Sequence, residues 1–316
     1  MSRFLGPSLI LICTVIWGSA FIAQKLGADH YGPFAITCYR NILGGIFLWF
    51  CIRIRDRRAT TRPIEQSEHS NNRTILLGGS LSGVCLFVAM VSQQLGIEHT
   101  TPGISAFLTA NYVLLVPVFA WVVGRGRPGC AVWSGVALAL LGTCLICFAD
   151  FGTLFSDFRL GVGEAWTLLC AALFAVQIMV VDRFARNVDV VRFSMVQLFV
   201  SALCALPFVF LPSELARASW PDFVAGLPAL FFIGVLSSGI AYTLQNLGQA
   251  RTPPALAAIL MAMESVFGAF FGWILLGDVL SPRQLLGCAL VFGAVLLSQF
   301  CARPTSSSSQ FGERTK

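Results

Sequence analysis

The feature that most constrains this chain is a series of almost uncharged apolar segments, each about 20 residues long. A helix of about 20 residues spans the ~30 Å hydrocarbon core of a lipid bilayer. Charged residues make up only 11% of the sequence, and the mean hydropathy is +0.78. Because a soluble domain has about 25% charged residues, this chain could not cover the surface of a soluble globule. The sequence therefore predicts an all-α integral membrane protein.

Ten such segments can be delimited. They cover residues 7–27, 33–53, 74–96, 102–123, 129–148, 161–181, 190–211, 226–248, 253–276 and 283–301. No small-x-small cleavage site follows the first segment, so it is predicted to be a retained helix rather than a secretory signal. The polar loop 55–73 is predicted to be mobile, and the serine-rich tail 304–316 to be a disordered cytoplasmic tail.

The distribution of basic residues predicts the orientation. With the N-terminus inside, sixteen Lys and Arg residues fall on the cytoplasmic side and four on the outer side. Cytoplasmic loops of membrane proteins carry an excess of these residues. We therefore predict a multi-pass protein of the cell inner (plasma) membrane with both termini in the cytoplasm. The net charge of +6 resides in short loops, so no nucleic-acid partner is predicted.

Cysteine placement argues against a metal site, a cofactor site or a disulfide framework. Nearly all of the eleven cysteines lie within or beside apolar segments, where cysteine behaves as a small hydrophobic residue. Cys144 and Cys147 have the spacing of a redox or metal motif, but no second pair or histidine accompanies them. We predict no metal and no cofactor.

The two halves of the chain show an internal repeat. At an offset of 152 residues, Gln93 aligns with Gln245 and Trp121 with Trp273. The same offset aligns Gly96, Thr100, Pro102 and Leu108 with Gly248, Thr252, Pro254 and Leu260. Near an offset of 153, Phe21 and Gln24 align with Phe174 and Gln177. The predicted units are residues 1–148 (spans 1–5) and 149–303 (spans 6–10).

An odd number of spans in each unit means that the second copy must insert upside down. The sequence thus predicts ten transmembrane helices arranged as two inverted five-helix repeats. Secondary transporters with such repeats bind their substrates near the bilayer midplane, between the repeats.

The sharpest candidate functional residue is Glu264. It lies ten residues after Pro254, which corresponds to about 15 Å along a helix and so to the middle of the bilayer. Ionisable residues at such depth are costly and often functional. Two roles compete for Glu264, a proton- or cation-handling site and a structural carboxylate that contacts a neighbouring helix.

Arg40 is the second candidate, about 10 Å past Pro33 by the same helical rise. A guanidinium at this depth needs a partner or a wet cavity. An ion pair with Glu264 is one alternative, and a structural role is the other.

Aromatic and amide side chains add a third group of candidates. On single helices they form stripes, and the repeat would bring Gln24, Gln93, Gln177 and Gln245 toward a shared axis. For each amide, hydrogen bonding between helices is the alternative to substrate binding. The remaining candidates of this group are Trp17, Asn111, Tyr112 and Tyr242.

Short motifs in the spans point to a known family. Span 1 carries Trp17-Gly18-x-x-Phe21, span 2 has Pro33 followed by Arg40, and Gln284-x-x-Gly287 opens span 10. Span 9 carries Glu264, Ala269, Trp273, Gly277 and Asp278 in that order. In this order and with the 5+5 layout, the chain resembles the drug/metabolite transporter superfamily, specifically its ten-span EamA-type proteins.

The resemblance implies export or exchange of amino acids, other metabolites or drugs, with spans 5 and 10 as an outer scaffold. Two positions depart from the family pattern. Asp278 stands where the family usually has glutamate, and Ser265 follows Glu264 where a proline is common. The second departure bears on how the helix bends beside Glu264.

We therefore expect a secondary transporter, an exporter or exchanger, of small organic metabolites such as amino acids, working by alternating access. Coupling to protons is expected if Glu264 has the proton-handling role rather than the structural one. The alternative is a multidrug or cation efflux transporter. An intramembrane enzyme would need paired aspartates, a metal triad or a nucleophile with a base at depth, and the spans offer none of these. A monomer or homodimer is expected in the lipid bilayer, with a small-molecule substrate as partner.

Overall fold

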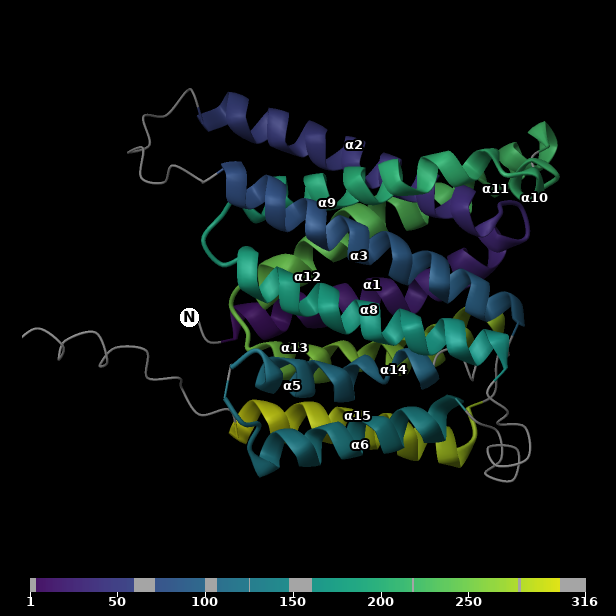
Figure 1. Ribbon diagram of the computed structural model, residues 1–316. Coiled ribbons are helices and arrows are strands. Elements are labelled where there is room, and N and C mark those ends of the chain that lie inside the picture. Colours follow the sequence, from purple (N-terminus) through teal and green to yellow (C-terminus); the bar gives the residue numbers. More distant parts are fainter. Residues whose placement is uncertain are drawn as a thin grey trace, which may run out of the picture.

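The computed structural model describes residues 4–59, 72–99, 107–124, 126–147, 161–217, 219–277 and 280–301, and within these ranges every regular element is a helix (Figure 1). The first half contains α1 (Leu5–Ala28), α2 (Pro33–Ala59), α3 (Asn72–His99), α5 (Tyr112–Val122) and α6 (Cys130–Cys147). The second half contains α8 (Val162–Phe184), α9 (Val190–Ala205), η1 (Leu206–Phe210), α10 (Pro212–Leu215), α11 (Trp220–Phe231), η2 (Phe232–Ala241), α12 (Tyr242–Gln249), α13 (Pro254–Met261), α14 (Met263–Phe271), η3 (Gly272–Leu276) and α15 (Pro282–Cys301).

Helix length and composition are those of an integral membrane protein. Within the described ranges, eight helical segments are long and apolar enough to cross a bilayer. They are Leu5–Ala28, Pro33–Arg58, Asn72–Gly96, Cys130–Cys147, Val162–Phe184, Val190–Phe210, Trp220–Gln249 and Pro254–Leu275. Two further apolar helices, Phe107–Val122 and Pro282–Ser298, are shorter. Each of these segments overlaps one of the ten apolar segments delimited in the sequence.

The loop between the second and third segments is shorter than the sequence suggested. Helix α2 continues to Ala59 and α3 begins at Asn72, so both ends of the stretch 55–73 are helical rather than mobile. Arg57 and Arg58 lie in the last turn of α2, where positive charge stabilises the carboxyl end of a helix dipole. Residues 60–71 and the tail 304–316 lie outside the described residues.

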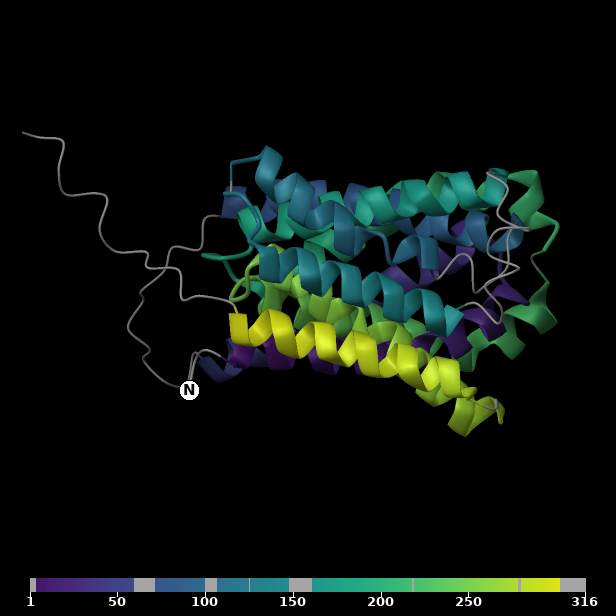
Figure 2. The ribbon, with the colours of Figure 1, turned by 90° about the horizontal axis from the view of Figure 1, so that it is seen from below.

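The long helices run side by side along one direction of the molecule (Figure 1; Figure 2). Figure 1 shows α2 and α9 at one edge, α6 and α15 at the opposite edge, and α1, α3, α8 and α12 between them. Helix α3 packs on α8 and α9, α1 packs on α12, η2 and α14, and α5 packs on α8 and α13. Helices α6 and α15 pack mainly on each other.

Glycines allow several of these helices to approach closely. Between α6 and α15, a Cβ added to Gly142 would lie 2.6 Å from the carbonyl oxygen of Gly287, and the reverse distance is also 2.6 Å. Between α3 and α9, a Cβ added to Gly83 would lie 2.6 Å from the carbonyl oxygen of Gln197. Membrane helices commonly associate through such small residues, since lipid provides no hydrophobic force between helices.

Candidate substrate-binding site

A cavity of about 60 Å³ lies where α1, α2, α3, α5, α8, α12, α13 and α14 meet. Nine of the ten residues singled out from the sequence line it, and they come from both halves of the chain. They are Trp17, Gln24, Arg40, Gln93, Tyr112, Gln177, Tyr242, Gln245 and Glu264. By comparison, a single water needs about 10–15 Å³ and a ligand pocket usually measures about 300–1,000 Å³. The cavity therefore has room for a few waters and no more.

Arg40 on α2 is held by neutral partners. Its Nε donates to Ser238 Oγ at 2.9 Å and its Nη2 donates to Ser237 Oγ at 2.9 Å. The remaining nitrogen, Nη1, donates to Gln24 Oε1 at 3.2 Å. The side chain is buried, with 5% exposed, and none of these contacts is an ion pair with Glu264. Hydroxyls and an amide therefore orient the guanidinium while leaving its positive charge uncompensated.

The serines that hold Arg40 belong to an irregular stretch of helix. Phe232–Ala241 (η2) is π-helical and joins α11 to α12 within one long apolar segment. The Ser237 carbonyl oxygen also accepts a hydrogen bond from Trp17 Nε1 at 3.2 Å. Departures of this kind from α-helical geometry occur frequently at functional sites. Here the π-helical stretch presents two hydroxyls and one carbonyl to α1 and α2.

Glu264 lies in the first turn of α14, directly after a break in the helix. Helix α13 ends at Met261, and the Ala262 carbonyl oxygen accepts from Ser265 N at 3.2 Å and from Ser265 Oγ at 2.8 Å. Ser265 therefore takes part in the bend although it is not a proline. Among the described residues, none forms a hydrogen bond or an ion pair with the Glu264 carboxylate.

The other half of the chain has a similar break. A turn at Ala110 and Asn111 precedes α5, which begins at Tyr112, a residue that lines the cavity. Asn111 itself does not line the cavity. Its Nδ2 donates to the carbonyl oxygens of Phe107 and Leu108, at 3.2 and 3.0 Å, so its amide satisfies the backbone of the turn.

The amides of the cavity bond to each other and to neighbouring helices. Gln245 Nε2 donates to Gln177 Oε1 at 3.4 Å, and Gln177 Nε2 donates to Ser82 Oγ at 3.4 Å. Both contacts are at the long end of the hydrogen-bond range. Long, weak bonds of this kind can be exchanged for bonds to a bound molecule at small cost.

Aromatic rings also line the cavity. Trp17 and Tyr242 meet edge to face, with ring centroids 4.9 Å apart and an interplanar angle of 61°. Their positions on α1 and α12 bring two distant parts of the chain into contact. Together with Phe174 on α8, they contribute apolar surface to the lining of the cavity.

Five lining residues were not among the sequence candidates. They are Met90, Thr109, Phe174, Ile178 and Met261. Helical spacing could have found them, because residues three or four apart share a face. Met90 lies three residues before Gln93, Thr109 three before Tyr112, and Met261 three before Glu264.

No group of three or more His, Cys, Asp or Glu residues with metal-binding geometry occurs among the described residues. The ten described cysteines are free thiols. The polar and aromatic groups that line the cavity are one guanidinium, one carboxylate, four amides, the Thr109 hydroxyl and four aromatic rings.

Comparison with known proteins finds the same protein family in both halves of the chain. The model of the EamA-like transporter family matches residues 4–148 and again residues 161–300. A solved crystal structure with 19% sequence identity has a TM-score of 0.71 and covers 94% of this chain and 97% of that chain. At this identity, the similarity shows the fold.

Curated relatives match along most of the chain. An uncharacterized transporter of Archaeoglobus fulgidus is 25% identical over 293 residues, which are 93% of this chain and 84% of the relative. The threonine/homoserine exporter RhtA of Escherichia coli is 28% identical over 308 residues, which are 95% of this chain and 93% of that protein.

Proposed function

We propose a transport mechanism for this chain from the premise that it belongs to the EamA-like transporter family, which both halves of the sequence match. The chain is a transporter-family membrane protein, and relatives named as transporters point away from an enzyme. The proposal is that it moves small organic metabolites, amino acids foremost, across the plasma membrane by alternating access.

One observation supports amino acids as the substrate class. Arg40 and Glu264 line the same cavity, and each is bonded to neutral groups or to none rather than to an opposite charge. A zwitterionic amino acid could satisfy both, with its carboxylate on the guanidinium and its ammonium on the carboxylate. The exporter RhtA acts on threonine and homoserine by its name, so these two amino acids are the first probes.

The inverted duplication supports a central site. Under the proposal, residues 1–148 and 149–303 are the two repeats and all ten apolar segments cross the membrane. The two helix breaks match, because Ala110 and Ala262 are separated by the same offset of 152 as Gln93 and Gln245. Helix packing follows the same relation. If α1 corresponds to α8 and α3 to α12, the contact of α3 with α8 corresponds to the contact of α12 with α1. Transporters place their substrates at broken helices of this kind.

The size of the cavity supports the proposal of alternating access. A volume of about 60 Å³ is too small for an amino acid, so the helices around it must part before a substrate can enter. The proposed orientation, with both termini in the cytoplasm, places the ends of α2 and α15 on the inner side. We further propose that Glu264 carries the coupling proton, since no described residue otherwise engages its carboxylate.

Counterflow in proteoliposomes tests the function. Purified protein in phosphatidylcholine vesicles should exchange radiolabelled threonine or homoserine for the same amino acid inside, with saturation. Efflux of a lipophilic organic cation with no exchange of any amino acid would instead support the cation-efflux alternative. Failure to transport any amino acid or cation would overturn the proposal.

One single variant and one pair of variants then test the site. Glu264→Gln should insert normally but lose the pH dependence of transport, and normal transport across pH would make this carboxylate structural. Gln93→Ala should weaken substrate binding, whereas Gln94→Ala changes the neighbouring glutamine, which does not line the cavity. Equal effects of the two substitutions would mean that the cavity is not the site.

A further inference from the structure

A second cavity, of about 300 Å³, lies at the end of the molecule where α1 finishes and α2 begins, opposite the N-terminus (Figure 1). Its walls come from the turn between α1 and α2, the start of α2, and the segment from η1 to α11. We call it the outer cavity, after the proposed orientation. It shares no lining residue with the central cavity. Because ligand pockets usually measure about 300–1,000 Å³, the outer cavity has room for a small organic molecule.

Aromatic rings make up much of the lining of the outer cavity. Tyr31, Tyr39 and Phe223 contact one another, with ring centroids between 5.9 and 6.1 Å apart. Their interplanar angles are 82°, 82° and 87°, so the three planes are nearly perpendicular, like the walls at the corner of a box. Trp220 stacks on Phe223, with centroids 5.8 Å apart. Sets of aromatic rings of this kind are used in proteins to bind organic cations over the ring faces.

The Tyr31 hydroxyl fixes this arrangement by linking α2 to α11. It donates to the Phe223 carbonyl oxygen at 2.7 Å. On the other side of the ring, a Cβ added to Gly226 would lie 2.5 Å from the ring of Tyr31, so glycine is needed for the ring to fit there. The aromatic walls are therefore held in place before any ligand arrives.

Glu214 supplies a carboxylate to the same cavity. The residue is 5% exposed, and its Oε2 accepts from Ala35 N at 3.0 Å while its Oε1 accepts from Phe34 N at 3.4 Å. A Cβ added to Gly32 would overlap this carboxyl group, so glycine allows its close approach to the start of α2. An ionised carboxylate has roughly four acceptor sites, and the two amides occupy two of them. Glu214 can therefore accept further hydrogen bonds from a ligand.

The cationic side chains that line the outer cavity already have acidic partners. Arg217 Nη1 donates to Glu98 Oε1 at 2.8 Å. His30 Nδ1 lies 3.5 Å from Asp222 Oδ1. Among the described residues, no Lys, Arg or His side chain forms an ion pair with Glu214. Its negative charge is thus the one in the cavity lining that has no ionic partner.

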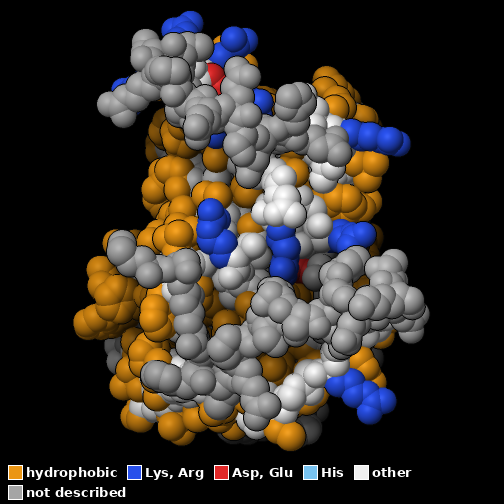
Figure 3. Space-filling view, turned by 90° about the vertical axis from the view of Figure 1, so that its left-hand side faces the viewer, with side chains coloured by type: hydrophobic (Ala, Val, Ile, Leu, Met, Phe, Trp, Pro, Cys, Tyr) orange, Lys and Arg blue, Asp and Glu red, His pale blue; other side chains and the backbone are white. Residues whose placement is uncertain are grey.

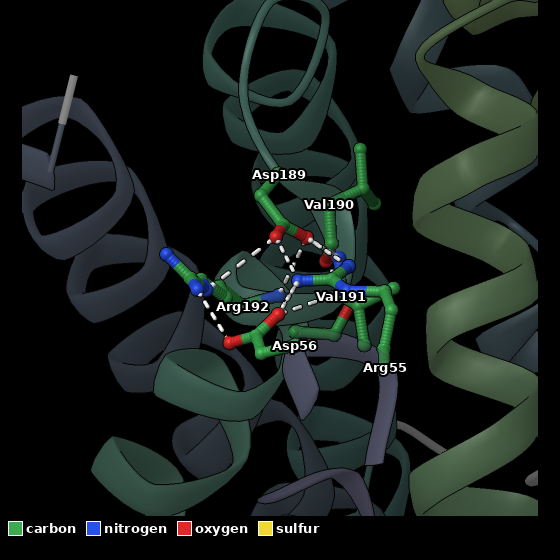
Figure 4. Close-up of polar contacts among 7 residues, drawn as sticks. Arg55, Asp56, Asp189, Val190, Val191 and Arg192 are labelled. Atoms are coloured by element: carbon green, nitrogen blue, oxygen red, sulfur yellow. Dashed lines mark hydrogen bonds and ion pairs between the residues drawn. The ribbon is translucent and has the colours of Figure 1, made fainter. Parts of the chain in front are cut away.

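The opposite end of the molecule shows what a carboxylate with ionic partners looks like. Figure 3 faces that end and shows Lys and Arg side chains in several places, with little Asp or Glu. In Figure 4, Asp56 and Asp189 lie between two arginines. Arg192 donates to Asp56 Oδ2 at 2.8 Å, and Arg55 donates to Asp189 Oδ1 at 3.2 Å. The outer cavity has no such arginine for Glu214, so a bound cation would take that place.

We propose that the outer cavity binds an organic ammonium cation with an apolar body, of which phenethylamine is a simple example. The ammonium group donates to the Glu214 carboxylate, and the apolar body packs against the rings of Tyr39, Phe223 and Trp220. An anion would be repelled by Glu214, and a neutral molecule would leave its charge without a partner. This site goes beyond the proposed function, and it requires neither the central cavity nor its substrate.

Equilibrium dialysis with a matched pair of ligands tests the requirement for positive charge. Purified protein in detergent micelles should bind radiolabelled phenethylamine saturably at neutral pH, where an amine of this kind is protonated. Unlabelled 2-phenylethanol has a hydroxyl in place of the ammonium and should compete at least about tenfold more weakly. Equal competition by the alcohol would overturn the proposal, and so would the absence of saturable binding up to millimolar ligand.

Variants of the two kinds of wall test the location. Glu214→Gln should weaken phenethylamine binding at least about tenfold, because the amide keeps an acceptor for α2 but loses the charge. Trp220→Leu should weaken binding about fivefold through loss of a ring face. Trp220 is 76% exposed, so this variant should fold normally and keeps the test open if Glu214→Gln proves unstable.

Two controls separate this site from other binding. Trp273→Leu removes another exposed tryptophan, which lines neither cavity, and it should leave phenethylamine binding unchanged. Equal losses in Trp273→Leu and Trp220→Leu would overturn the proposal. Glu264→Gln should also bind phenethylamine as wild type does. Loss of binding in Glu264→Gln but not in Glu214→Gln would place the cation in the central cavity and overturn the proposal. Since binding is measured without transport, the absence of an outer site would leave the transport proposal untouched.

Discussion

Gly18 offers the sharpest test of the geometry around the central cavity. It follows Trp17 on α1 and faces α14, the helix that carries Glu264. A Cβ added to Gly18 would lie 2.5 Å from Phe267 Cβ, 2.7 Å from the Phe267 carbonyl carbon and 2.8 Å from Gly268 N. Since carbon atoms pack at about 3.5–4.0 Å, Gly18→Ala must push the two helices about 1 Å apart.

The expected cost follows from two opposing terms. Overpacking a helix interface costs about 1–3 kcal/mol, and contact with rigid backbone atoms belongs at the upper end of that range. Alanine in place of glycine inside a helix returns about 1 kcal/mol. Gly18→Ala should therefore lower the free energy of unfolding by about 2 kcal/mol.

Gly293→Ala on α15 removes the helix-propensity term from the comparison. A Cβ there would have no heavy atom within 4 Å, so this variant should gain about 1 kcal/mol. The difference between the two variants, about 3 kcal/mol, measures the α1–α14 contact alone. Reversible unfolding in mixed detergent micelles, followed by circular dichroism, gives both values. Equal stabilities of the two alanine variants would refute the close approach of α1 to α14.

Three further predictions follow from other contacts. Arg40→Lys should lower transport at least about tenfold with little loss of stability. The reason is that an ammonium cannot reproduce the planar guanidinium that bonds to two serines and an amide. Counterflow of the preferred amino acid measures the transport rate. Partial burial alone would raise the pKa of Asp189, but hydrogen bonds from Arg55 and from the Arg192 amide, with both positive charges, lower this pKa overall. Asp189→Asn, which keeps a good N-cap, should therefore destabilise the protein by up to about 1 kcal/mol above pH ~4, and the gap to wild type should close as the pH falls below that value in unfolding titrations. Gly142→Val should separate α6 from α15 and lower the unfolding midpoint without changing the Michaelis constant for the substrate. A change in substrate affinity at unchanged stability would contradict this prediction.

The helices and most lining residues were predictable because polar groups are scarce in this sequence. Within an apolar helix, an amide or a charged side chain is costly to expose to lipid. Gln93, Gln245 and Glu264 therefore point toward the protein interior whatever the details of packing. The partners of Arg40 were not predictable from the sequence. Whether Arg40 contacts Glu264 or the hydroxyls of Ser237 and Ser238 depends on the π-helical geometry of Phe232–Ala241. The composition of that stretch is that of an ordinary apolar helix.

Asn111 shows the converse limitation. Its residue type and depth matched those of the lining amides, yet the break in the helix gave its side chain two nearby carbonyl oxygens to satisfy. Short polar side chains compete for backbone groups wherever a helix is interrupted. A sequence pattern that assumes an unbroken helix therefore places such a residue on the wrong face.

Under the proposed duplication, the cavity contains matched and unmatched pairs of side chains. Gln93 and Gln245 are identical at an offset of 152, whereas Tyr112 and Glu264 share the same offset and differ in chemistry. Two carboxylates in one small cavity would repel each other, and one of them would remain protonated. A single carboxylate opposite a phenol avoids this repulsion. The repeat can therefore supply a symmetric frame of amides for opening to either side, while the one carboxylate of the cavity stays in the second half alone.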